Sequence, residues 1–143
     1  MEELKEYLDH IRQLQMEVDH EWMNLQETKE KLFSTSSAID QEPVIVSRDP
    51  HVMEEKIACY DSMLGTYHDK AWNLIEARHE LIGMIEKLND AGEIRLLFLR
   101  YVRLMKWDDI AHEMNKSVRW CYRKNGQGLR DLRKVFYNPP AGT

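Results

Sequence analysis

The sequence contains few of the residues that characterise disulfide-rich, collagen-like or disordered chains. Its 143 residues include two cysteines, six glycines and four prolines. Cys59 and Cys121 lie 62 positions apart with no CxxC pair, and no secretory leader follows Met1, so we expect a reduced, cytoplasmic protein. No apolar run approaches the ~20 residues of a membrane-spanning helix, so we expect no membrane segment.

Signatures of catalysis and metal binding are also missing. The stretch His79-Glu80-Leu81-Ile82-Gly83 begins like a zinc-protease helix but lacks the second histidine one turn later. The chain contains no glycine-rich phosphate loop, no nucleophile elbow and no distinct pair of carboxylates. We therefore expect no catalytic residues, no metal, no cofactor and no small-molecule substrate.

Two series of apolar residues predict two long helices. Leu4, Ile11, Val18, Leu25 and Leu32 recur every seven residues, which predicts one amphipathic helix over residues 2–33, with Leu8 and Trp22 or Leu14 in part of a second row. The second series alternates spacings of three and four, as coiled-coil seams do. It consists of Ile57, Tyr60, Leu64, Tyr67, Ala71, Leu74, Arg78, Leu81, Ile85 and Leu88.

The start of the second helix and the segment before it have their own signals. Asp49-Pro50 predicts that start, with Asp49 as N-cap and Pro50 in the first turn. The polar residues before it predict a loop over 34–49.

Trp22, Tyr60, Tyr67 and Trp72 are expected to pack in the seam between the two long helices. The two helices could pair as a hairpin within one chain or across a homodimer, and the polar breaks at Gln15 and Lys29 favour the hairpin.

Charge divides the chain at Asp90. Residues 1–90 contain nine Lys and Arg against twenty Asp and Glu, a net charge of −11, whereas residues 91–143 contain eleven against five, a net charge of +6. A basic segment of this kind raises the expectation of a nucleic-acid partner, although a solvated helix face gives the same pattern.

The basic segment has the pattern of a helix-turn-helix. Asp90 and Glu93 form a capping-box pattern that predicts a helix running to about Leu104-Met105-Lys106. A short helix is expected from Trp107 to about Met114, followed by a turn in which Asn115 adopts the left-handed conformation. Ser117 is expected to cap a final helix that ends near Phe136. Ala111 allows close helix crossing, and Trp107 is expected to pack in the core.

These residues resemble region four of bacterial sigma factors. The likeness runs over about 40 residues, through Leu99-Arg100-Tyr101, Lys106-Trp107-Asp108-Asp109-Ile110-Ala111, Ser117 and Leu129-Arg130-Asp131-Leu132-Arg133-Lys134. It is closer still to the small phage and prophage regulators that have this region behind a helical segment, such as ArpU-type late-gene regulators. No stretch resembles the promoter-melting region of sigma factors, so the resemblance implies a regulator, with RNA polymerase as a candidate partner.

The resemblance also implies which residues meet DNA. Ser117 matches the N-cap, and Val118, Arg119, Tyr122 and Arg123 match positions that contact promoter DNA. Val118 departs from the basic residue usual in the family. The glycines at 126 and 128 depart as well, and we expect the helix to bend or end early there, since glycine costs ~1 kcal/mol relative to alanine in a helix interior. The predicted DNA contacts are Lys116, Ser117, Val118, Arg119, Tyr122, Arg123, Lys124 and Gln127.

Together these features predict an all-α protein: an acidic helical hairpin or coiled coil over residues 1–89, a basic helix-turn-helix over 90–137 and a flexible tail over 138–143. The expected function is sequence-specific binding of double-stranded DNA and regulation of phage or prophage genes. Two alternatives remain: a phage DNA-packaging protein like a small terminase subunit, and a helical protein-interaction adaptor that does not bind DNA.

Overall fold

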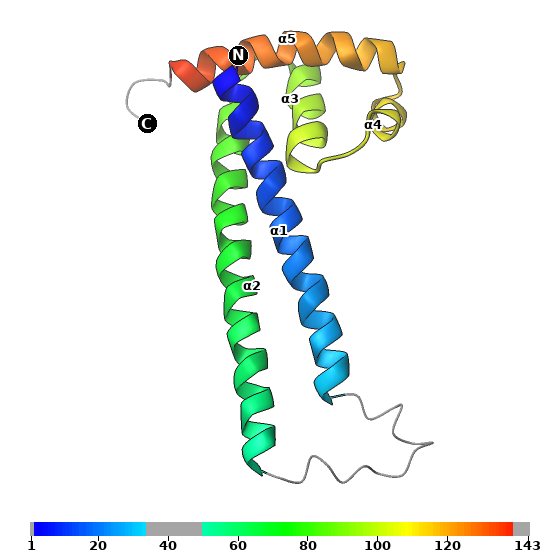
Figure 1. Ribbon diagram of the computed structural model, residues 1–143. Helices are drawn as coiled ribbons and strands as arrows, with labels where there is room; N and C mark the ends of the chain where they lie inside the picture. Colours follow the sequence, from blue (N-terminus) through cyan, green and yellow to red (C-terminus); the bar gives the residue numbers. More distant parts are fainter. Residues whose placement is uncertain (1, 34–49, 139–143) are drawn as a thin grey trace. The chain divides into compact units, whose positions relative to one another are not determined.

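A computed structural model describes residues 2–33 and 50–138 of the chain. The elements are α1 (Glu2–Phe33), α2 (Pro50–Ile85), α3 (Ala91–Leu97), the π-helical segment η3 (Phe98–Val102), α4 (Trp107–Met114) and α5 (Val118–Tyr137). No strand occurs in these two ranges (Figure 1), so the predicted all-α class is confirmed.

The two long helices begin and end close to the predicted positions. α1 has Glu2 and Glu3 in its first turn and Lys31 in its last turn, which matches the sign of the helix dipole at each end. α2 begins at Pro50, a residue that suits the first turn because it has no backbone N–H. The expected N-cap at Asp49 and the loop over 34–49 lie outside the described residues.

The chain forms two compact units. One consists of Met1–Gln13 and Ile75–Thr143, and the other of Leu14–Leu74, so α1 and α2 each contribute to both. The change in charge at Asp90 therefore does not coincide with a change in packing, because the last turns of α2 pack in the same unit as the basic helices.

In the unit of residues 14–74, α1 and α2 contact each other within the chain. The Trp22 and Tyr67 rings lie 5.4 Å apart, and Lys70 Nζ donates to Glu21 Oε1 at 3.0 Å. Val18, Leu25 and Leu74 are buried, as the seam predicts.

Two predicted seam residues are not in the seam. Ile57 is 45% exposed, and the more buried positions of the series begin at Tyr60. Trp72 is 59% exposed. It follows Ala71, which faces the seam, so its side chain points about 100° away around the helix.

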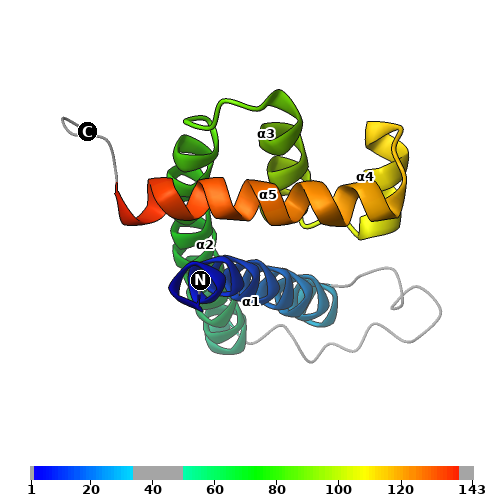
Figure 2. The same cartoon turned by 90° about the horizontal axis from the view of Figure 1, so that it is seen from above.

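In the other unit, a core of aliphatic side chains holds the short helices to the ends of the long ones. Its fully buried members include Leu4 and Ile11 of α1, Leu81 and Ile85 of α2, Leu96 and Leu97 of α3, Ile110 of α4, and Cys121 and Leu132 of α5. Burial of each large aliphatic side chain contributes about 1.5–3 kcal/mol to stability. α3 and α4 both lie on one side of α5 (Figure 1), α4 at its N-terminal end and α3 nearer its middle (Figure 2).

The helix after Asp90 differs from the prediction. Asp90 is the N-cap as expected, since its Oδ1 accepts from the backbone N–H of Gly92 at 2.8 Å and of Glu93 at 3.2 Å. The α-helical part ends at Leu97, however, and Arg103 N donates to Phe98 O, five residues back, at 3.0 Å. The helical region therefore ends with a π-helical turn at Val102, a few residues before the predicted end near Leu104-Met105-Lys106, and Leu104 has a left-handed backbone with φ 55°.

The two glycines of α5 do not interrupt it. α5 is continuous from Val118 to Tyr137, so the expected bend or early end is wrong. Gly128 is buried, and a Cβ there would lie 3.2 Å from Leu97 Cγ, which means that the missing side chain lets α3 and α5 approach closely. At Gly126 a Cβ would have no neighbour within 4 Å.

We predict that Gly128→Val lowers the free energy of unfolding by about 1–3 kcal/mol, because Leu97 is fully buried and cannot move aside for the added carbons. Gly126→Val is the matched control in the same helix and should change stability by less than about 0.5 kcal/mol. Chemical denaturation followed by circular dichroism measures both. Equal effects of the two substitutions would contradict the close packing of α3 on α5.

Candidate nucleic-acid interface

α4 and α5 are joined by a tight turn whose geometry follows from its residues. Asn115 has φ 58° and ψ 44°, a left-handed conformation that asparagine tolerates well, as predicted. Lys116 N donates to Ala111 O at 3.0 Å, which closes the C-terminal end of α4. Ser117 Oγ then accepts from Trp120 N at 3.0 Å and caps α5, which confirms the predicted N-cap.

The inner sides of α4 and α5 are apolar and buried. Ile110 and Ala111 of α4 are 0% and 7% exposed, and Cys121 of α5 is 0% exposed. Burial in apolar surroundings raises the pKa of the Cys121 thiol, so the thiol stays protonated at neutral pH. The orientation of α5 is therefore set by its buried face, and its opposite face is left to solvent.

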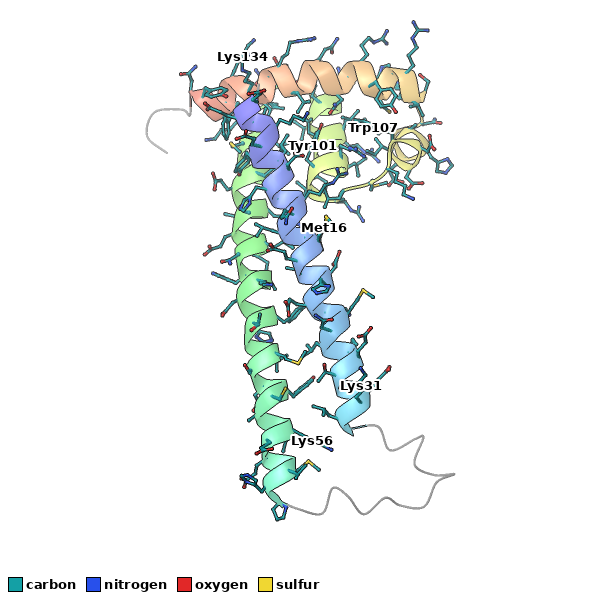
Figure 3. All side chains as sticks on the ribbon, in the orientation of Figure 1. Met16, Lys31, Lys56, Tyr101, Trp107 and Lys134 are labelled. Atoms are coloured by element: carbon teal, nitrogen blue, oxygen red, sulfur yellow. The ribbon has the colours of Figure 1, made fainter. Side chains whose placement is uncertain are left out.

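The solvent face of α5 has a row of basic side chains, which we call the basic stripe. It consists of the exposed cations Arg119, Arg123, Arg130, Arg133 and Lys134, with the uncharged Gln127 among them. At 100° per residue these side chains fall within about 120° of the helix circumference, and at 1.5 Å per residue they extend along about 22 Å of the axis. Figure 3 shows long side chains with nitrogen ends on the side of α5 away from α3 and α4.

The charges of the stripe are largely unneutralised. Among the described residues, Arg119, Arg123 and Arg130 form no ion pair, and Lys134 lies 3.8 Å from Asp131 with its own side chain 79% exposed. An ion pair this exposed contributes little energy. The stripe is therefore available to bind an anion.

Six of the eight predicted contact residues are exposed at this end of α5. Besides Arg119, Arg123 and Gln127 they are Lys116, Ser117 and Tyr122, whereas Val118 is half-buried. Lys116 Nζ lies 5.3 Å from the centre of the Trp120 ring. Arg130 and Arg133 were not among the predicted residues, although they follow Arg123 by seven and ten positions, because the glycines suggested that the helix ends before them.

Lys124, the eighth predicted contact, is engaged elsewhere. Its Nζ donates to Asp90 Oδ2 at 2.7 Å, and its side chain is only 18% exposed. The hydrogen bond from Lys124, with those from the first turn of α3, holds the pKa of Asp90 below its usual range. Lys124 therefore ties α5 to the start of α3 and lies outside the basic stripe.

Trp107 packs between two elements, as predicted from the sequence. Its half-buried ring lies 4.5 Å from the guanidinium of Arg100 in η3 and 4.9 Å from the Tyr122 ring in an edge-on arrangement. The Trp107 ring therefore supports the exposed side chain of Tyr122. Figure 3 labels Trp107 and, on η3, Tyr101, whose hydroxyl donates to Asn125 Oδ1 of α5 at 3.0 Å.

A buried carboxyl group lies where α3 crosses α5. Glu93 is 4% exposed, and its Oε2 has no hydrogen-bond partner. Burial, a hydrogen bond with Asp131 and the negative charges of Asp131 and Asp90 raise the pKa of Glu93 to about 7. In the predicted capping box this side chain points back to the start of its own helix, whereas in the structure it faces Asp131.

The described residues contain no group of three or more His, Cys, Asp or Glu that could hold a metal ion. Within residues 2–33 and 50–138, no helix has the length and apolar character needed to cross a membrane. Comparisons with protein-family models, curated proteins and solved structures found no match to this chain.

We predict that Glu93→Gln changes how stability depends on pH. Because the pKa of Glu93 is raised on folding, protonation of this group stabilises the fold fully below about pH 4.5, and this stabilisation is lost as the pH rises through about 7. The variant should therefore gain stability relative to the wild type between these values, by up to about 3 kcal/mol. Denaturation of both proteins from pH 4.5 to 8.5 measures the difference.

Glu113→Gln, which removes an exposed carboxylate from the same unit, provides the baseline. A difference between Glu93→Gln and the wild type that stays constant across the pH range would show that the pKa of Glu93 is not raised on folding.

Proposed function

We propose that this protein binds double-stranded DNA sequence-specifically through α5 and regulates transcription. The observation that carries the proposal is the basic stripe, because it lies on the free face of a capped helix whose other face is buried. α5 contains six Lys and Arg and one acid, Asp131. A helix face that only contacts water does not require such an excess of positive charge.

The dimensions of α5 suit the major groove. That groove is about 12 Å wide and admits one α-helix. In a helix-turn-helix the residues near the N-terminus of the second helix read base edges. Here they would be Arg119, Tyr122 and Arg123, with Gln127 one turn further on. Arginine can bind guanine through two hydrogen bonds and glutamine can bind adenine in the same way.

The other cations would then hold the phosphate backbone. Lys116 in the turn and Arg130, Arg133 and Lys134 along the stripe would neutralise phosphates on either side of the groove. Gly126 lies between the two parts of the stripe and has open space around it, which would let a DNA strand approach the helix closely.

The likeness to sigma region four extends the proposal to phage or prophage genes and to contact with RNA polymerase. The acidic first 90 residues, with a net charge of −11, would be repelled by DNA. A role for α1 and α2 in dimerisation, in docking on polymerase or in covering the basic stripe fits this charge better than a role in DNA contact.

A second candidate is a helical adaptor that binds other proteins. The observation that favours it is the set of large apolar side chains exposed on the long helices, since exposed apolar patches often mark protein contacts. They are Met16, Trp22, Met23, Ile57, Trp72 and Ile75. This candidate predicts no salt-dependent affinity for DNA.

We predict that the protein binds fluorescein-labelled duplexes with an affinity that falls steeply between 50 and 200 mM salt, because bound cations displace counterions from phosphates. Arg119→Ala/Arg123→Ala should weaken binding at least tenfold and reduce the preference for the phage-promoter duplex over the random-sequence duplex, because both arginines are placed at base edges. Fluorescence anisotropy with random-sequence and phage-promoter duplexes measures both quantities.

Lys29→Ala/Lys31→Ala in α1 is the matched control, since it removes two exposed cations outside α5. An equal loss of affinity in the control would contradict recognition by α5. Absence of binding at 50 mM salt, with a folded sample, would favour the adaptor. A ring of many subunits in light scattering would favour the packaging protein.

A further inference from the structure

A cavity of about 290 Å³ opens beside η3, within the unit that contains α5. Its apolar wall is formed by Leu4 and Leu8 of α1, Tyr101 of η3, Leu104, Trp107 of α4 and Leu129 of α5. Small-molecule sites in proteins are typically of 300–1,000 Å³ and mostly apolar, so this volume would hold a ligand of one or two rings.

The backbone departs from regular helix geometry along this wall. η3 ends with the hydrogen bond from Arg103 N to Phe98 O, which spans five residues. The next hydrogen bond, from Met105 N to Leu99 O at 3.0 Å, spans six residues. Leu104 has φ 55°, a conformation that costs a residue with a side chain about 1–3 kcal/mol. π-Helical turns and backbone strain both occur preferentially at functional sites. Here the π-helical turn and the strained Leu104 lie at the same cavity. This cavity was not predicted from the sequence, and DNA binding by α5 does not require it.

The charges around the cavity favour an anion. Lys5 and Arg12 of α1 and Arg100 of η3 line it, against one carboxylate, Asp9. Arg100 is held in place, because its Nη1 donates to Met105 O at 2.8 Å and its guanidinium lies over Trp107. Lys5 and Arg12 are exposed at the surface, where they are free to meet a carboxylate whose ring is buried below.

We infer that this cavity binds a small aromatic carboxylate. Tyr101 and Trp107 would contact the ring, and Arg12, with Lys5, would pair with the carboxylate. The ligand would act as an effector of α5.

The cavity also has a physical connection to the basic stripe. Trp107 lines the cavity and contacts Tyr122, which is exposed next to Arg119 and Arg123. A ligand ring that packs on Trp107 would therefore move Trp107 relative to Tyr122. This movement would change the affinity of α5 for DNA. This regulatory step rests on the proposed function, whereas binding of the ligand does not.

The test uses naphthalene-2-carboxylate as the probe and its uncharged analogue 2-naphthalenemethanol for comparison, titrated into the full-length protein and followed by two-dimensional NMR. We expect saturable shifts that centre on Leu104 and the Trp107 indole N–H, with the carboxylate bound at least fivefold more tightly than the alcohol. Arg12→Gln should remove this preference, and Lys29→Gln in α1 should leave it unchanged.

Leu129→Trp, which fills the cavity, should abolish the shifts; Arg12→Gln changes only an exposed side chain and keeps the test informative if the filled variant does not fold. Shifts that do not saturate, that centre on residues 14–74, or that are equal for the acid and the alcohol would overturn the inference.

The regulatory step is tested by repeating the DNA titration with the cavity saturated. A change of at least threefold in the Kd for DNA supports it, and an unchanged Kd contradicts it while leaving the cavity assignment intact. Failure of the protein to bind DNA without the probe would contradict the proposed function alone.

Discussion

The close packing of α5 on α3 is the constraint on which the rest of the C-terminal unit depends. Gly128 leaves space for Leu97, and Cys121 and Leu132 on the same face of α5 are fully buried. Because this face is buried, the arginines on the opposite face of α5 are exposed and contact either solvent or a binding partner. One buried contact between two helices therefore decides where the positive charge of the molecule is displayed.

Ionic contacts refine this arrangement. Lys124 is the cation of α5 that turns inward, and its pair with Asp90 holds the start of α3 against α5. Glu93, one turn further along α3, is buried and faces the carboxyl group of the half-buried Asp131. Three acids and a lysine at the same crossing make the attachment of α5 sensitive to protonation.

Local signals in the sequence were sufficient to predict where most of the helices lie and the caps at Asp90 and Ser117. The seven-residue spacing from Leu4 gives α1, and Asp90, Asn115 and Ser117 act as the cap and turn residues that their chemistry suggests. Features that depend on contacts distant in sequence were missed. Gly128 looks like a helix breaker until Leu97 is seen beside it, and neither η3 nor the left-handed Leu104 has a local signature. Lys124 looks like any other surface cation until Asp90 is placed next to it.

The most direct test of DNA recognition by α5 is to map amide chemical-shift changes by NMR when a DNA duplex is added to the full-length protein. Recognition by the basic stripe predicts the largest changes from Lys116 to Gln127 and smaller ones at Arg130, Arg133 and Lys134. The opposite result, with the largest changes in residues 14–33 and 50–74 or with none in α5, would contradict a DNA-binding role for this helix.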